Sequence, residues 1–296
     1  LGDGTTTQST TPVAVSLPTG RTASSVDTGE YHTCAVLDDG SAYCWGSNFY
    51  GKLGNGSACY QGSAGCANDS TIPVQVALPP GFSAVEISAG AYHTCALGVN
   101  GSVYCWGFRG LVGDGSPLNY SFENIRKTPI QVDLPPGRTA VSVDAGYLHT
   151  CAIMDDGSLY CWGFNDYSQL GDGTTEYSNV PVRADRLGTS IVTSVSVGFH
   201  QTCVTTVDYS AFCWGDNGHG ESGADSPSHY GPANIVIPHA IGTLSTSQEE
   251  CMPGTWQNQT GQTWCFAAAA GYYADSNAST SQTPCPQGTY NPASGS

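Results

Sequence analysis

Paired cysteines are the residues of this sequence whose type and spacing are best suited to chemistry. Cys34 and Cys44 bracket an Asp-Asp-Gly turn in "HTCAVLDDGSAYCWG" (32–46), and similar stretches recur at 93–107, 149–163 and 201–215. Zinc fingers and ribbons place roughly two to four residues between their cysteines, and the spacing here is wider. Thirteen cysteines also indicate an oxidising compartment. We therefore expect disulfides rather than metal-binding or reactive thiols.

Each cysteine pair is predicted to close a β-hairpin. Cys34 and Cys44 lie symmetrically about Asp39, which leaves a three-residue loop with Gly40 at the position that needs a left-handed backbone. In the fourth copy a tyrosine or serine (209–210) replaces this glycine, so a different turn is expected there. Directly opposed residues at a non-hydrogen-bonded site lie close to disulfide distance. The expected bridges are Cys34–Cys44, Cys95–Cys105, Cys151–Cys161 and Cys203–Cys213, with a local bridge Cys59–Cys66 in the loop after the first hairpin.

Three histidines are candidates for metal ligands or general bases, because His32, His93 and His149 recur at the same position before a cysteine. Gln201 replaces them in the fourth copy. Equivalent positions of successive repeats lie apart in space, so we do not expect a shared metal ion. A structural role is predicted for all three.

Two further patterns come close to functional motifs. "GHGESGA" (218–224) is similar to the G-x-S-x-G nucleophile elbow, but it aligns with a loop, and Ser222 stands where the first repeat has Leu53. Asp-Gly pairs are frequent, yet no D-x-D-x-D-G calcium loop exists, and Asp-Gly is common in hairpin turns. No phosphate-binding loop, dinucleotide fingerprint or positioned acid pair is present. We predict a protein that is not an enzyme and binds no metal or other cofactor.

The elements that position these residues are short strands. The aligned cysteines 34, 95, 151 and 203 give periods of 61, 56 and 52 residues, and the first repeat offers strand candidates at 12–17, 23–29, 32–37 and 41–46. No stretch has a useful helical period. Four strands per repeat predict an all-β fold of propeller blades, with the cysteine hairpin as the outer half of a blade and the Trp-Gly pairs in its core. The sequence contains four complete blades and a lone fifth strand at 232–238.

Charge narrows the range of partners. The chain has 8 Lys and Arg against 24 Asp and Glu, a net charge of −16, which leaves no basic stripe for nucleic acid or an anionic membrane. Only 11% of the residues are charged, as fits a secreted and glycosylated surface. No run is long enough to span a membrane. The sequons for N-glycosylation are at Asn55, Asn68, Asn100, Asn119, Asn258 and Asn277.

The repeated pattern "GxxHTCAVxxDGxxYCWG" resembles the repeat of the regulator of chromosome condensation family, in the cysteine-paired form that has the propeller-type β-lactamase-inhibitor fold. The resemblance covers roughly residues 1–240 and recurs with Trp45, Trp106, Trp162 and Trp214 in register. It implies a seven-bladed propeller, so further blades would lie upstream of Leu1 or the array would close by oligomerisation. It also implies that the repeated histidine hydrogen-bonds backbone within its own blade.

The tail resembles a different module. After a Ser/Thr linker near 240–250, the sequence resembles the ephrin-receptor-like cysteine-rich repeat, which implies a Cys251–Cys265 bridge. The next bridge would join positions 268 and 282, where Ala268 and Gln282 stand, so both partners are absent together. Cys285 is then left over. We predict a propeller over 1–243 and cysteine-rich modules over 244–296, cut at the C-terminal end.

The combination of these two modules resembles mastigoneme-like proteins, the hair subunits of algal flagella. That resemblance implies an extracellular structural glycoprotein on a cell, flagellar or ciliary surface, which forms a filament by self-association or with other structural proteins. The alternative is a secreted binding module that grips a partner protein with loops on one propeller face. The nucleotide-exchange and chromatin role of the founding family is disfavoured by the disulfides and the acidic charge.

Overall fold

The computed structural model describes residues 1–58, 68–116 and 125–220, together with short strands farther along the chain. Two compact units are present, Leu1–Ile237 and Pro238–Ser296. Apart from two single turns of 3-10 helix, η1 (Arg109–Leu111) and η2 (Asp185–Leu187), every regular element among the described residues is a β-strand. The fold is therefore all-β, as the strand patterns predict.

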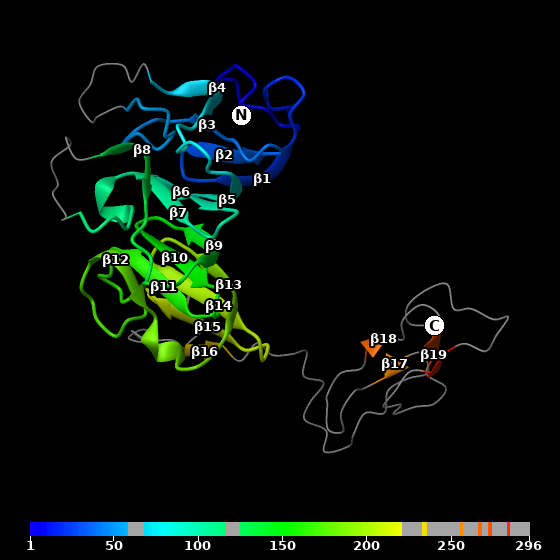
Figure 1. Cartoon of the computed structure of the whole chain (residues 1–296), viewed down its shortest axis with the longest axis vertical. Helices are drawn as coiled ribbons and strands as arrows, with labels where there is room; N and C mark the ends of the chain where they lie inside the picture. Colours follow the sequence, from blue (N-terminus) through cyan, green and yellow to red (C-terminus); the bar gives the residue numbers. More distant parts are fainter. Residues whose placement is uncertain are drawn as a thin grey trace. The chain divides into compact units, whose positions relative to one another are not determined.

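The first unit contains four antiparallel sheets of four strands, and each sheet is one propeller blade (Figure 1). Strands that follow one another in the chain lie side by side in every blade. The first two blades contain β1 (Ala23–Thr28), β2 (His32–Leu37), β3 (Ala42–Gly46), β4 (Ser70–Gln75), β5 (Ala84–Ala89), β6 (His93–Gly98), β7 (Val103–Gly107) and β8 (Arg126–Gln131). The last two contain β9 (Ala140–Ala145), β10 (His149–Met154), β11 (Leu159–Gly163), β12 (Ser178–Arg183), β13 (Val192–Val197), β14 (Gln201–Thr206), β15 (Ala211–Gly215) and β16 (Ala233–Ile235).

The strand pairing corrects the predicted limits of a blade. Residues 12–17 form no strand. The equivalent segment of the second repeat, 73–78, overlaps the end of β4, which pairs with β3 as the fourth strand of blade 1. The predicted lone strand at 232–238 is the fourth strand of blade 4, because β16 pairs with β15. The cysteine hairpin is consequently the middle pair of strands in each blade and not its outer half. A long loop precedes each fourth strand, so the repeat period alone does not show which hairpin that strand joins.

The apolar core lies between neighbouring blades. Cys34 and Val36 of blade 1 share one buried cluster with Ile87 and Trp106 of blade 2, and similar clusters lie at the next two boundaries. Val26, on the flank of blade 1 that points away from blade 2, is 62% exposed, whereas its equivalent Ile87 is 2% exposed. A blade therefore buries its flank only against a neighbouring blade, as is typical of repeat proteins.

The second unit contains two short antiparallel pairs. The first joins β17 (Thr255–Trp256) to β18 (Phe266–Ala267), and the second joins β19 (Tyr272–Tyr273) to β20 (Thr283–Pro284). The predicted Cys251–Cys265 bridge, the leftover Cys285 and the boundary at residue 243 lie outside the described residues, so they stay predictions.

Candidate functional site

The two middle strands of each blade place their cysteines directly opposite each other. Cys34 is in register with Cys44, their Cα atoms lie 4.1 Å apart, and their sulfur atoms are bonded. Both residues are fully buried. The same bridge is present in the other blades as Cys95–Cys105, Cys151–Cys161 and Cys203–Cys213. These cysteines join two strands and offer no thiol to a metal or a substrate, and the Cys59–Cys66 pair lies outside the described residues.

The turns between the cysteines share one backbone conformation. Gly40 and its equivalents in blades 2 and 3 have φ between 74° and 77°, in the left-handed region. Tyr209 has φ 63° at the same position of blade 4, so the expectation of a different turn there is wrong. The Asp208 carboxylate accepts the Ser210 N–H within this turn. The strand pairing on either side and this local bond hold a tyrosine in a conformation that favours glycine.

The aspartates of the hairpin turns bind their own loops. Asp39 Oδ1 accepts the N–H and the hydroxyl of Ser41, and Asp156 Oδ1 accepts the same two groups of Ser158. This is the ordinary behaviour of Asp in turns. In the part of the chain that the structure describes, no three His, Cys, Asp or Glu side chains are grouped so as to hold a metal ion. Ser222 of the elbow-like motif lies outside that part.

The three repeated histidines link neighbouring blades. His32 Nε2 lies 2.8 Å from Thr94 Oγ1 of the next blade, and Thr94 Oγ1 donates to the Lys52 carbonyl. Because the threonine proton is used in that bond, the histidine Nε2 must carry the proton and donate it. Equivalent bonds join His93 to Thr150 at 2.6 Å and His149 to Thr202 at 2.8 Å.

This geometry corrects the expectation of a backbone bond within the same blade, since the partner is a side chain of the following blade. Burial lowers the pKa of His93 and of His149 to about 3. Burial also places the pKa of His32 well below its usual value, and the nearby Lys52 charge adds to the effect. The histidines are therefore neutral, and their hydrogen bonds to threonines of the next blade hold the blades together.

The buried tryptophans of blades 2, 3 and 4 each donate to a carbonyl of the preceding blade. Trp106 Nε1 lies 2.8 Å from the Lys52 oxygen, the same oxygen that accepts from Thr94. Trp214 and Thr202 share the Gln169 carbonyl in the same way. Histidine, threonine and tryptophan of the repeat thus meet around one backbone oxygen at a blade boundary.

A second set of interblade contacts lies on the first strands of the blades, where sequence reasoning did not find it. Asp27 Oδ2 accepts the Ala89 N–H at 2.7 Å, and Asp144 Oδ2 accepts the Val197 N–H at 2.6 Å. Ser88 lies between these carboxylates, with its Oγ 3.0 Å from one and 3.1 Å from the other. Burial raises the pKa of Asp144. These polar groups bind backbone of the next blade and so serve the stacking of blades.

One end of the blades carries a row of aromatic rings. Because the strands of a blade are antiparallel, the loops after its first and third strands lie at the same end. We define the aromatic face as nine aromatic side chains from the described parts of these loops: Tyr31, Phe49, Tyr50, Tyr92, Phe108, Tyr147, Tyr167, Phe199 and His200.

The rings contact one another across the blade boundaries. Tyr50 of blade 1 lies edge-on to Tyr92 of blade 2, with ring centroids 5.5 Å apart. Tyr92 meets Tyr147 of blade 3 at 5.2 Å, and their hydroxyl oxygens lie 2.8 Å apart in a hydrogen bond. Tyr147 stacks on Phe199 of blade 4 at 3.7 Å. The aromatic face therefore runs without a break over all four blades.

Carboxylates lie beside the blade 4 end of this row. Tyr167 stacks on His200 with centroids 4.6 Å apart. Burial lowers the pKa of His200, while the charges of Asp216 and Asp166 act in the opposite direction. This histidine is therefore neutral at pH 7 and contributes a flat ring to the face.

Lys52 lies beneath the blade 1 end of the row. Its Nζ donates to the Ala91 carbonyl and lies 5.5 Å from the centroid of the Tyr31 ring. The residue is only 2% exposed, and burial lowers its pKa to about 8. The Lys52 ammonium group thus binds the loop between β5 and β6 from the protein interior and is not exposed to solvent.

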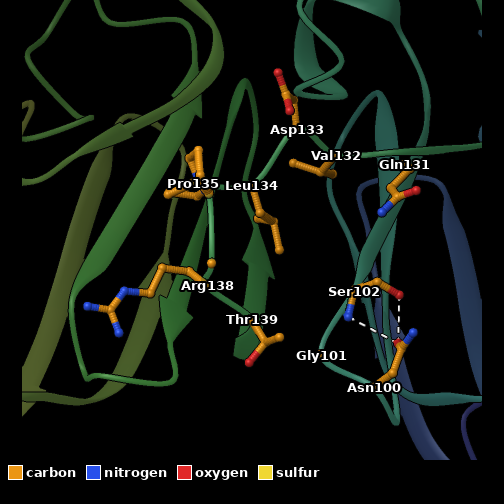
Figure 2. A pocket seen from close by; sticks show the side chains of 12 residues that line it. Asn100, Gly101, Ser102, Gln131, Val132, Asp133, Leu134, Pro135, Arg138 and Thr139 are labelled. Atoms are coloured by element: carbon orange, nitrogen blue, oxygen red, sulfur yellow. Dashed lines mark hydrogen bonds between the residues drawn. The ribbon is translucent and has the colours of Figure 1, made fainter.

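The opposite end of the blades carries an open groove of about 530 Å³ beside the blade 2 hairpin (Figure 2). Asn100, Gly101 and Ser102 line this groove together with residues 131–139. The Asn100 oxygen accepts the N–H and the hydroxyl of Ser102, and the residue is exposed. None of the residues that line this groove is aromatic. The aromatic face is therefore the better candidate for a binding site.

Comparison with known proteins agrees with the blade structure. The model of the regulator of chromosome condensation (RCC1) repeat matches residues 39–97, 100–153 and 156–205, more than half of the chain. The chain belongs to the RCC1 repeat family. A second model of the same repeat matches residues 23–52 and 140–169.

Two curated relatives share about 30% of the aligned residues with this chain. The ultraviolet-B receptor UVR8 of Arabidopsis thaliana is 30% identical over 223 residues, which cover 75% of this chain and 48% of the receptor. The human E3 ubiquitin-protein ligase HERC2 is 29% identical over 244 residues, which cover 80% of this chain and 5% of the ligase. The chain thus spans about half the length of one curated relative and a small part of the other.

Two solved structures share the fold. Human WBSCR16 has a TM-score of 0.64 at 18% identity and covers 91% of this chain and 68% of its own. Prp20p of Saccharomyces cerevisiae has a TM-score of 0.59 at 24% identity and covers 72% of this chain and 50% of its own. RCC1-repeat propellers are mostly binding proteins or exchange factors.

Among the described residues, no helix is long and apolar enough to cross a membrane.

Proposed function

We propose that this chain is an extracellular propeller that binds a partner protein with its aromatic face. The continuous ring row over four blades is the observation that carries this proposal. Tyrosine and phenylalanine are enriched at protein interfaces, because each supplies a large contact area from a side chain with few rotamers. Prp20p has binding properties toward Gsp1p and histones, which supports a protein partner for a propeller of this family.

The extracellular setting rests on the disulfides. Four buried bridges at equivalent positions are typical of proteins that fold in oxidising compartments. The flagellar or ciliary surface named above remains part of this proposal and depends on the resemblance of the tail.

Attached glycans are a further part of the proposal, and the described sequons differ in their surroundings. Asn100 is exposed, and its side-chain oxygen, rather than the nitrogen that carries a glycan, makes the bonds within the turn. Asn68 donates its amide nitrogen to the Ala58 carbonyl, and Asn55 is half-buried. The remaining sequons, Asn119, Asn258 and Asn277, lie outside the described residues.

Site-specific photo-crosslinking tests the binding function. A photoreactive amino acid at position 199 lies on the aromatic face, and the same amino acid at position 209 lies on the hairpin end, where Tyr209 is 80% exposed. Incubated with the extracellular material of its source, the position 199 protein should form one discrete adduct that the position 209 protein lacks. Equal adducts from both positions would contradict the proposal.

Assembly into a filament is the second candidate, and the two outer flanks of the blade array favour it. Val26 is exposed on the flank of blade 1, and Thr205 is exposed on blade 4 where the other blades bury Val36, Leu97 and Ile153. Two unlike flanks fit a head-to-tail contact, which yields open filaments when the rotation does not close.

Sedimentation velocity of the native protein tests the filament. Assembly should grow with concentration, and the Val26→Glu variant should remain a monomer because a charge then stands on the contact surface. A native protein that is monomeric at every concentration contradicts the filament and leaves the binding function intact.

A further inference from the structure

The exposed rings of the aromatic face are spread over several blades. Tyr31 is 66% exposed in blade 1, Tyr167 is 38% exposed in blade 3, and Phe199 is 53% exposed in blade 4. The rings between them are half-buried and pack on one another. The face therefore presents separate ring surfaces along a line rather than a single pocket, which suits an extended segment of a partner.

The loops that carry these rings are strongly acidic. In their described parts they contain a single exposed or half-exposed Lys or Arg, Arg109, since Lys52 is buried. One acidic group, Asp114, is already paired with Arg126. The carboxylates in the described parts of these loops are Glu30, Asp69, Asp114, Asp166, Asp172, Glu176 and Asp216.

Two of these carboxylates directly adjoin an exposed ring in the sequence. Glu30 precedes Tyr31 and raises the pKa of the Tyr31 phenol through a hydrogen bond and its charge. Asp166 precedes Tyr167 and is exposed. An aromatic ring beside a carboxylate can accept a cation on its face while the carboxylate neutralises the charge.

We propose that the segment bound by the aromatic face is rich in arginine or lysine. This inference rests on the proposed function and names its partner chemistry. A guanidinium group stacks on aromatic faces and pairs with carboxylates, so it uses both features of the loops. A neutral sugar would use the rings and leave the carboxylates unpaired, and an acidic peptide or a nucleic acid would be repelled by the charge of −16.

Fluorescence anisotropy with labelled peptides tests the proposal on the full, disulfide-bonded chain. One peptide alternates arginine with glycine, a second has citrulline at every arginine position, and a third has glutamate there. Citrulline keeps the planar shape of arginine and lacks its charge. We expect the arginine peptide to bind at least tenfold more tightly than the other two, and its affinity to fall as salt screens the carboxylates.

Paired variants locate the binding. Tyr167→Leu and Phe199→Leu keep apolar side chains but remove the ring faces, and each should weaken binding of the arginine peptide about three- to tenfold. Glu30→Gln and Asp166→Asn should each weaken it about two- to fivefold. The matched controls at the opposite end, Tyr209→Leu and Asp133→Asn, should leave the affinity unchanged. Thermal unfolding of each variant confirms that it is folded.

The outcomes separate the two proposals. Equal binding of the citrulline and arginine peptides, both sensitive to Phe199→Leu, overturns the cationic partner and leaves the aromatic face as a protein-binding surface. Binding of the arginine peptide that is unaffected by the face variants also overturns the cationic partner, and the photo-crosslinking experiment then decides the binding function of the aromatic face. Absence of measurable binding of the arginine peptide to the folded protein overturns the cationic partner.

Discussion

At the boundary between blades 1 and 2, two side chains bind a single backbone oxygen and a third binds one of those two. The Thr94 hydroxyl and the Trp106 indole donate to the Lys52 carbonyl, the His32 ring bonds to the Thr94 hydroxyl, and all of these side chains are buried. The sequence shows that histidine and tryptophan recur, but not that the partner threonine belongs to the following repeat. Such contacts join residues about a whole repeat apart, and no local pattern contains them.

The neutral histidines predict a loss of stability in acid. In the folded protein the pKa of His93 is about 3, below the usual value of 6.5, so the unfolded chain binds the proton first. The contribution of His93 is therefore complete above about pH 6.5 and is lost as the pH falls toward 3. Blade 4 has a glutamine, Gln201, at the position of His93. The His93→Gln variant should be less stable than the native protein at pH 7, but its unfolding free energy should fall less steeply as the pH decreases.

Urea unfolding at a series of pH values measures this effect. The difference in unfolding free energy between the native protein and His93→Gln should narrow below pH 6.5, by at most about 1.4 kcal/mol per pH unit. A difference that stays constant from pH 7 to pH 4 contradicts a neutral buried His93.

The hairpin between the middle strands is the element that the sequence predicts best. Cysteine spacing and the turn glycine are local, so the register of Cys34 opposite Cys44 follows from a few residues. The place of the fourth strand does not follow, because β4 is reached across a long loop. The aromatic face does not follow either, because Tyr31 directly precedes its histidine while Tyr147 lies one residue earlier, which hides the repeat.

The blade 4 turn predicts a stabilising substitution. Tyr209 has φ 63°, a conformation that costs a non-glycine residue about 1–2 kcal/mol, whereas glycine loses about 0.5–1 kcal/mol in chain entropy. Tyr209→Gly should therefore raise the unfolding free energy by up to about 1 kcal/mol. Chemical denaturation of the oxidised protein measures the change.

Gly40→Ala is the opposite control for this turn. A Cβ at Gly40 would lie 2.0 Å from Ser83 Oγ, in addition to the backbone cost, so this variant should be destabilised. A loss of stability in Tyr209→Gly would show that the tyrosine ring contributes more than its backbone costs.

At the scale of the whole molecule, the blades form an array in which each boundary between blades contains side-chain hydrogen bonds and a buried apolar cluster. The sequence predicts the all-β class, the four blades and the repeat family, because the same sequence pattern recurs in each repeat. The binding partner was not, because it depends on loops whose sequences differ between repeats. Those loops give the molecule one aromatic, acidic end and one end of hairpin turns.

Covalent labelling of tyrosines, with and without a saturating arginine-rich peptide, tests the aromatic face most directly. Tyr31 and Tyr167 are exposed on that face, and Tyr209 is exposed at the opposite end, so one native protein contains both the site and its control. The peptide should reduce labelling of Tyr31 and Tyr167 severalfold and leave Tyr209 unchanged. Protection of Tyr209, or unchanged labelling at all three tyrosines, would contradict the account.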